Sequence, residues 1–198
     1  MNNNIDMDIL FEEIFRKLIS PDFGKNLVGE LPLFIQPIPV TGQTELDGQL
    51  ERLVSRLGKK GKTAIIINLY ELAMQLLEEE GVLETILEEE SDIPQEDISS
   101  TLDSILDIKS VIIPRIQDKI CESNPDFMFI TGVGRIYPFI RSHGILNNIE
   151  ELAMNNNLIL FFPGEYNNLQ LFLFGTISDE NYYRGHNLNE IKVNNVTV

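Results

Sequence analysis

A glycine-containing turn holds the residues of this sequence whose types and spacing best suit ligand chemistry. The turn, Thr131-Gly132-Val133-Gly134, follows an apolar run and precedes Arg135, Arg141 and His143. Ligands of open α/β sheets bind in the crevice outside the carboxyl ends of the strands. A phosphate-bearing ligand, such as a nucleotide, beside Arg135, Arg141 or His143 is therefore one interpretation of this pattern. Because the third glycine of the dinucleotide-binding motif is missing, a tight strand-to-helix turn without a ligand stays open as the alternative.

Two stretches nearer the C-terminus combine aromatic and charged residues. FFPGEY (161–166) ends in Glu165 and Tyr166, and a later stretch places Tyr182, Tyr183 and Arg184 in succession. Aromatic rings beside cations anchor protein partners or stack on nucleic-acid bases. A net charge of −16 disfavours direct nucleic-acid binding. A protein-binding surface and a packed terminal segment remain the two interpretations.

Patterns typical of metal sites and of catalytic sets are missing from the sequence. It contains two histidines, His143 and His186, and one cysteine, Cys121. We find no Cys or His pair at zinc-ligand spacing and no G-x-S-x-G elbow. No metal and no cofactor are predicted, although the spacing of the many carboxylates leaves a Mg²⁺ site open. Enzymatic activity is uncertain, with the balance against it.

The stretch Gly58-Lys59-Lys60-Gly61-Lys62-Thr63 resembles a phosphate-binding loop but has the wrong spacing. The first glycine of G-x-x-x-x-G-K-[ST] should stand at position 56, which is Arg56. The stretch also follows a helical pattern and enters an apolar run, whereas a phosphate loop leaves a strand and opens a helix. We interpret it as a helix-to-strand turn with Gly58 at the helix C-cap, and ATP binding is not expected.

The composition is that of a soluble globular protein, and its acidic charge is unevenly spread. The chain has 198 residues, of which 43% are hydrophobic, and we expect a single domain over 1–198. No apolar run is long enough to span a bilayer, and the lone cysteine fits a cytoplasmic protein. Twelve of the 31 acidic residues lie in 78–108, which has no Lys or Arg. This block is either a solvated helical face or a docking surface for a basic partner.

Hydrophobic periodicity predicts an alternation of helices and strands. Residues 8–19 and 44–57 have helical stripes, the second with Thr44 and Asp47 as a capping box. Prolines in 31–40 suit an edge strand or a strand end. Further helices are predicted from Glu71, around 98–106, from Pro114 and over 135–154. The remaining strands are predicted at 64–69, 127–131, 158–162 and 169–174, with PGEYNN as the connection between the last two.

This order predicts an α/β fold. We expect a mostly parallel central sheet of about five strands, helices on both faces and an antiparallel edge near the C-terminus. The acidic helices of 78–122 are an insertion between two strands, since a crossover needs only one helix.

Several short motifs, taken together in this order, are specific. They are Gly132-Val133-Gly134 with Tyr137-Pro138 and Arg141-Ser142-His143, Phe162-Pro163-Gly164-Glu165-Tyr166, Leu173-Phe174-Gly175, and Asn181-Tyr182-Tyr183-Arg184. With them the sequence resembles the BrxB family of bacteriophage-exclusion (BREX) defence systems. The resemblance extends over nearly the whole chain, including LPLFIQ and KTAIIINLYEL.

The resemblance implies a cytoplasmic complex that blocks phage replication and supports methylation of host DNA. Similar systems combine a methyltransferase, a large ATPase and an alkaline-phosphatase-like protein called PglZ. It implies a non-catalytic adaptor that contacts other BREX proteins, with PglZ the first to test, and no membrane. The family brings no catalytic motif. The candidate surface residues are Gly132, Gly134, Arg135, Tyr137, Arg141, His143, Glu165, Tyr166, Tyr182, Tyr183 and Arg184.

Overall fold

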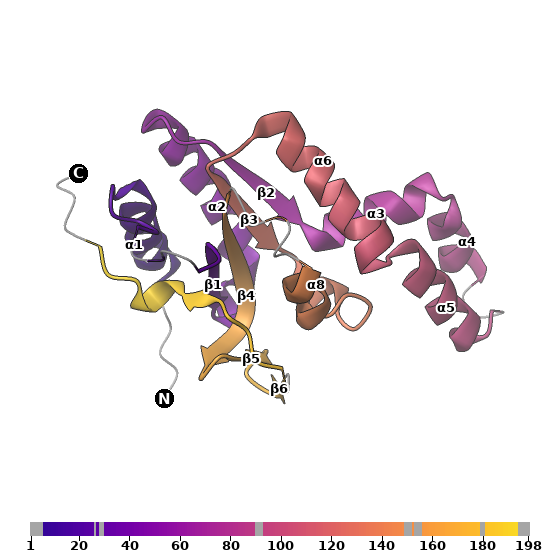
Figure 1. Cartoon of the computed structure of the whole chain (residues 1–198). Helices are drawn as coiled ribbons and strands as arrows, with labels where there is room; N and C mark the ends of the chain where they lie inside the picture. The colour runs from indigo at the N-terminus through magenta and orange to yellow at the C-terminus, as the bar shows by residue number, and fades with distance from the viewer. Residues whose placement is uncertain are drawn as a thin grey trace.

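A parallel sheet runs through the middle of the molecule (Figure 1). The computed structural model describes residues 6–25, 27, 30–89, 93–148, 152, 156–178 and 181–193. Five strands follow the order β2-β3-β4-β1-β7, and all four neighbouring pairs are parallel. The strands are β1 (Leu33–Ile38), β2 (Ala64–Asn68), β3 (Phe127–Thr131), β4 (Asn157–Asn167), β5 (Gln170–Leu173), β6 (Ile177–Ser178) and β7 (His186–Asn187).

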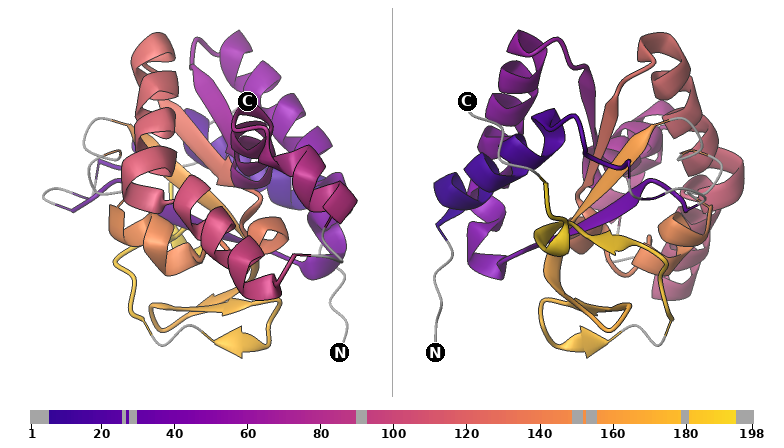
Figure 2. Two further views of the ribbon diagram at one scale, coloured as in Figure 1. Left: turned by 90° about the vertical axis from the view of Figure 1, so that its right-hand side faces the viewer. Right: turned by 60° about the vertical axis from the view of Figure 1, so that its left-hand side comes forward.

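Helices cover both faces of this sheet (Figure 2). The helix α1 and the helix α2 pack on one face, whereas α3, α6, α7 and α8 pack on the other. These elements confirm the predicted α/β class with a mostly parallel sheet. The helices are α1 (Met7–Ile19), α2 (Gln43–Lys59), α3 (Leu69–Glu79), α4 (Val82–Glu89), α5 (Gln95–Ile105), α6 (Ile113–Ser123), α7 (Val133–Ile136) and α8 (Ser142–Asn148), with short turns η1 (Val40–Gly42), η2 (Ile108–Ile112) and η3 (Leu188–Glu190).

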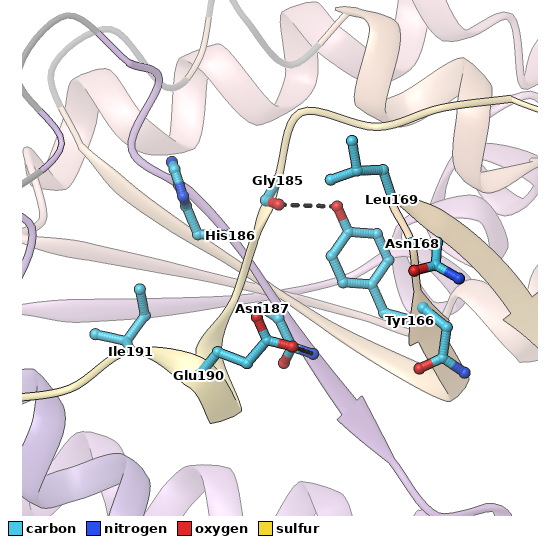
Figure 3. Close-up of a pocket in the computed structure, with 9 residues that line it drawn as sticks. Tyr166, Asn168, Leu169, Gly185, His186, Asn187, Glu190 and Ile191 are labelled. Carbon is cyan, nitrogen blue, oxygen red and sulfur yellow. Dashed lines mark hydrogen bonds between the residues drawn. The ribbon is translucent and has the colours of Figure 1, made fainter.

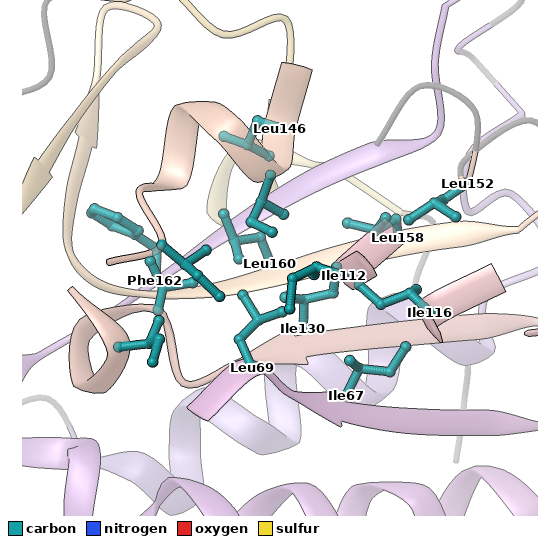
Figure 4. Close-up of a cluster of buried hydrophobic side chains, with 14 of the residues drawn as sticks. Ile67, Leu69, Ile112, Ile116, Ile130, Leu146, Leu152, Leu158, Leu160 and Phe162 are labelled. Carbon is teal, nitrogen blue, oxygen red and sulfur yellow. The ribbon is translucent and has the colours of Figure 1, made fainter. Parts of the chain in front are cut away.

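The strand β3 is buried along its whole length, as its uninterrupted apolar sequence predicts. Phe127 and Phe129 pack against α1 and α2, whereas Met128 and Ile130 point to the opposite cluster. Successive side chains of a strand alternate between faces, so one five-residue run serves both cores. Figure 4 shows the second cluster, in which Ile130 lies among side chains from β2, β4 and α6.

An antiparallel hairpin extends the sheet near the C-terminus, as predicted, but its turn lies later than the sequence indicates. The segment PGEY belongs to β4, which pairs with β1 up to Pro163 and with β5 from Gly164 onward. Gly164 has a φ of 150°, and a Cβ there would collide with the backbone of Phe172. The turn is formed by Asn168 and Leu169, both with positive φ. Pro163 and Gly164 therefore mark a change of pairing partner within one strand.

Prolines in β1 fit its position beside a very short neighbour. The prolines predict an edge strand or a strand end. β1 lies between β4 and β7 and is not an edge strand, whereas Pro37 does lie near its end. The strand β7 pairs only with Phe34 and Ile35. Pro37, which has no N–H to donate, lies beyond that pairing. Pro37 therefore lies in the part of β1 that has no β7 residue beside it.

The predicted helices α1 and α2 form, with a correction at both ends of α2. In α1 the stripe Leu10, Phe11, Ile14, Phe15 and Leu18 is buried, as its periodicity predicts. α2 begins directly after η1 with Gly42 as its N-cap, and no side chain caps it, so the Thr44–Asp47 capping box is wrong. Gly58 lies inside α2, whereas Gly61 has the left-handed conformation that ends the turn into β2.

The predicted helix over 135–154 is broken. α7 ends at Ile136, and Tyr137 takes an extended conformation before Pro138. The residue before a proline is pushed out of the helical region by the proline ring, which accounts for the break. A second helix, α8, begins at Ser142, and the rest of the predicted helix lies mostly outside the described residues.

The acidic insertion extends beyond the sheet (Figure 1). It attaches through Ile112, Ile113 and Ile116, which are buried in the core cluster beside α3. An ion pair between Arg115 of α6 and Glu79 of α3 fixes the same junction. None of the described side chains of α4 is buried. The insertion therefore packs into the core at its α6 end, whereas its α4 end is solvated.

Asp126 joins the amino ends of β2 and β3. Its carboxylate accepts hydrogen bonds from the Thr63 backbone N–H (2.8 Å) and hydroxyl (3.1 Å), and it lies 3.3 Å from Lys62 Nζ. The Asp126 N–H in turn donates to Thr63 Oγ1 (3.0 Å). The backbone hydrogen bond from Thr63, with its hydroxyl and Lys62 adding to it, lowers the pKa of Asp126 below its usual value. These bonds set the register in which the two strands begin.

We expect Asp126→Asn to lower the free energy of unfolding by about 1 kcal/mol at neutral pH, because hydrogen bonds to an ionised acceptor are lost. A lowered folded-state pKa stabilises the fold above the unfolded value of 3.8 and ceases to do so as pH falls. The difference between variant and wild type should therefore shrink between about pH 7 and about pH 3. Urea unfolding at both pH values measures it, and a gap that stays constant would contradict this role.

Candidate functional site

The carboxyl ends of β2 and β3 lie side by side and bring Asn68 next to Thr131. Asn68 caps the following helix, because its Oδ1 accepts from the N–H groups of Tyr70 (3.1 Å) and Glu71 (3.4 Å). Thr131 leads directly into Gly132. The glycine-containing turn therefore lies at the edge of the sheet where ligands of α/β proteins bind.

Packing alone explains both glycines of the turn. Gly132 has a φ of 81°, and a Cβ there would collide with the Asn68 side chain and approach the Tyr70 nitrogen to 2.8 Å. A Cβ on Gly134 would lie 2.8 Å from the Pro163 ring and 3.0 Å from the Phe174 ring. The tight-turn interpretation thus accounts for the G-x-G spacing, and any case for a ligand must come from the other side chains.

A crevice of about 290 Å³ opens beside this turn. Its walls come from the start of α2, the ends of β2 and β3, the glycine turn, and Phe174 of the β5–β6 connection. Two buried polar atoms, Thr131 Oγ1 and Gln43 Nε2, have no hydrogen-bond partner among the described residues. Arg135 is exposed at the mouth, with its guanidinium 4.0 Å from the centre of the Tyr70 ring.

A larger cavity, of about 830 Å³, lies between the β4–β5 turn and the C-terminal segment (Figure 3). Figure 3 shows Tyr166 extending from β4 toward Gly185, to which its hydroxyl is hydrogen-bonded. That one hydroxyl is shared between the carbonyl oxygens of Tyr183 and Gly185, both at 2.8 Å. Burial raises the pKa of Tyr166 to about 12. The hydroxyl is therefore protonated and occupied, which makes it a structural tie rather than an acid or base.

Two predicted surface tyrosines lie in the core instead. Tyr166 is buried and ties down the C-terminal segment, and Tyr183 is only 3% exposed. Alternate residues of this extended segment point in opposite directions, so Tyr182 is 73% exposed and Arg184 is also exposed. The packed-segment interpretation holds for Tyr166 and Tyr183, whereas Tyr182 and Arg184 remain available to a partner.

The other predicted residues are spread over the same end of the molecule. Glu165 is exposed on β4 and accepts a hydrogen bond from Asn167. Tyr137 and Arg141 are exposed between α7 and α8. His143 lies in α8, but its side chain is outside the described residues. The structure brings Gly132, Gly134 and Arg135 to one crevice and leaves Glu165, Tyr182 and Arg184 on the hairpin side.

Several residues of interest have no motif in the sequence. Gln43 comes from a distant segment and stands in no pattern that indicates a polar role. The glycine-turn motif contains Thr131 but does not indicate that its hydroxyl is buried without a partner among the described residues. Leu169 and Phe174 are exposed on the hairpin although they belong to the run predicted as a strand, and Ile177, between Thr176 and Ser178, is exposed as well. Only the positive φ of Leu169 and Phe174, which a sequence does not display, separates these turn residues from strand residues.

The described residues contain neither a metal-ligand cluster nor a membrane-spanning helix. No group of three or more His, Cys, Asp or Glu side chains among them is arranged to hold a metal ion. No helix in the described part of the chain has both the length and the apolar character to cross a bilayer.

Known proteins similar to this chain share one description. A family model described as "BREX protein BrxB" matches residues 65–188. A "BREX protein BrxB" of Bacillus cereus (strain H3081.97) is 39% identical over 183 residues, which cover 89% of this chain and 94% of the relative. A protein of the same name from Escherichia coli O9:H4 (strain HS) is 26% identical over 159 residues, covering 80% and 78%. No solved structure matches the chain.

We expect Tyr166→Phe to lower the free energy of unfolding by about 1–2 kcal/mol, because two buried carbonyls lose their donor. The pKa of this hydroxyl rises from 10.0 to about 12 in the fold, so its stabilisation is complete below pH 10 and disappears as pH rises toward 12. Urea unfolding of both proteins at about pH 8 and about pH 11 should show a smaller difference at the higher pH. Equal stabilities at the lower pH would show that the hydroxyl contributes nothing.

Proposed function

The chain belongs to the BrxB family of BREX proteins, and from that premise we propose that it is a non-catalytic adaptor within a BREX anti-phage complex. In this role it joins other components in the cytoplasm, where the system defends the cell and methylates host DNA. Its working parts are surfaces that bind other proteins. The proposal rests on the side chains that are exposed on the C-terminal hairpin and on the segment that follows it.

The carrying observation is an exposed apolar surface on the C-terminal hairpin. We call Leu169, Phe174, Ile177, Tyr182 and Arg184 the hairpin surface; all five are exposed. The Tyr183 N–H donates to the Leu169 carbonyl (2.9 Å), which holds Tyr182 next to the β4–β5 turn. Leu173 pairs with Ile177 at the other end of β5, so Phe174 and Ile177 lie close together.

The hairpin surface has the composition of an interface centre. Aromatic residues and arginine are enriched there and contribute a large share of binding energy. β5 and β6 lie beyond the carboxyl ends of the parallel strands (Figure 1), and no helix covers them in these views (Figure 2). A partner can therefore reach them without any rearrangement of the core.

The acidic insertion is a second surface for the same role. Leu87 of α4 is 68% exposed, and it is followed by further acidic residues. An apolar side chain within a strongly negative segment suits a partner whose contact surface is basic. The two surfaces lie at different ends of the chain's structure, which lets one molecule hold two partners (Figure 1).

The PglZ-like component is the partner we propose first. The family to which the chain belongs functions within a system that contains PglZ, and an adaptor needs at least one large component to hold. At the larger cavity, the Tyr166 hydroxyl is committed to two carbonyls and does not act as an acid or base. Both observations support a binding role over catalysis.

Truncating the hairpin surface tests this role. We expect Tyr182→Ala and Arg184→Ala each to weaken co-purification with the PglZ-like protein about tenfold, since central aromatic and arginine side chains carry much of an interface's affinity. Both positions are exposed, so the melting temperature should stay near that of wild type. Ile9→Ala and Arg52→Ala, an exposed aliphatic residue and an exposed arginine outside both proposed surfaces, are the matched controls.

Three results separate the alternatives. Loss of binding in Leu87→Ala alone would assign the contact to the acidic insertion. Tyr183→Ala should lower the free energy of unfolding by about 3 kcal/mol, because it truncates a buried aromatic side chain. Loss of binding in this variant would therefore reflect instability and would not report on the interface. A wild-type chain that co-purifies with none of the BREX components would contradict the adaptor role itself.

A further inference from the structure

The crevice at the carboxyl edge of the sheet holds two polar groups that the described chain leaves unused. Thr131 is 0% exposed, and its hydroxyl has no partner among the described residues. The side-chain nitrogen Nε2 of Gln43 is also buried and has no hydrogen-bond partner among the described residues. Both residues line the crevice. Buried polar side chains are nearly always hydrogen-bonded, so two unpaired ones in one small cavity indicate a missing partner.

The fold aims both groups at the same space. Thr131 is in register with Asn68 and lies two residues after Phe129, so its side chain points to the face of the sheet that α2 covers. Gln43 stands in the first turn of α2, whose N-cap, Gly42, supplies no side-chain acceptor. A helix N-terminus carries a partial positive charge and favours an anionic group nearby.

A cation completes the set at the mouth of the crevice. The Arg135 guanidinium lies over the Tyr70 ring and has no carboxylate within ion-pair distance among the described residues. A threonine hydroxyl, an amide N–H₂ and a guanidinium all donate hydrogen bonds. The matching ligand is therefore an acceptor with negative charge.

Size and charge narrow the ligand class. Pockets for drug-sized ligands begin at about 300 Å³, so a crevice of about 290 Å³ favours a small ligand over a whole nucleotide. Asp47 also lines the crevice and, with a chain charge of −16, opposes a doubly charged phosphate. Leu46 and Phe174 provide an apolar wall. These properties fit a singly charged group on a short apolar stem.

We propose that this crevice binds a carboxylate. Its oxygens accept from Thr131 Oγ1, Gln43 Nε2 and the Arg135 guanidinium, and its aliphatic stem lies against Leu46 and Phe174. The carboxylate belongs either to a free small acid or to a glutamate side chain of a polypeptide. The inference is independent of the adaptor role, because the purified chain alone must show it.

Amide NMR of the purified chain provides the test. Titration with butyrate should produce saturable shifts at Thr131, Gly132 and Arg135, with a Kd of about 1–10 mM for so small a ligand. A blocked Ala-Glu-Ala peptide, titrated in parallel, distinguishes the two sources: tighter binding than butyrate assigns the site to a polypeptide, and weaker binding assigns it to a free acid. Inorganic phosphate should bind more weakly than either.

Variants separate binding from structure. Thr131→Val and Arg135→Gln should each weaken butyrate about tenfold, whereas Thr131→Ser, which keeps the hydroxyl, should bind as wild type does. Because the hydroxyl is unpaired without ligand, Thr131→Val should melt at the wild-type temperature or above it. The absence of saturable shifts up to about 50 mM butyrate would overturn the proposal. Unchanged butyrate affinity in both variants, or tighter binding of phosphate than of butyrate, would also overturn it. So would a lower melting temperature of Thr131→Val than of wild type.

Discussion

Backbone pairing along β4 connects the crevice to the hairpin, two parts of the molecule that have a proposed role. On one side β4 pairs with β3, whose end carries Thr131 and the glycine turn, and on the other it pairs with β1. Beyond Pro163 the same strand becomes the first arm of the hairpin. Because a strand with neighbours on both sides cannot shift by one residue without turning its side chains to the wrong face, β4 fixes the crevice and the hairpin relative to each other.

The crevice shows how packing and binding share one set of residues. The Phe174 ring of the hairpin packs against Gly134, and Phe174 also forms part of the crevice wall. Asn68 caps α3, whereas the hydroxyl of its neighbour Thr131 has no hydrogen-bond partner in the described part of the chain. A change in the position of the hairpin would therefore alter the shape of the crevice. This contact gives a physical route by which occupancy of the crevice and binding at the hairpin surface influence each other.

Sequence patterns located most of the framework and only part of the site. β3 was predicted at its observed residues because an unbroken apolar run leaves few alternatives, and the buried stripe of α1 follows from its period. Side-chain direction in the C-terminal segment was not visible, since Tyr182 and Tyr183 look alike in sequence and only the core decides which one it buries. Thr131 and Gln43 come to line one crevice through the crossover from β1 to β2, an arrangement that no local pattern indicates.

The two borders of the main sheet differ in their capacity to accept another strand. At one border, β7 pairs with β1 over only two residues, and Pro37 of β1 has no N–H. An added polypeptide strand would therefore form few backbone hydrogen bonds there. On the opposite side β2 offers five residues, and no described strand lies beyond it. Of these two borders, β2 is therefore the one better able to accept another strand, and the charge of −16 on each chain opposes such pairing between identical molecules.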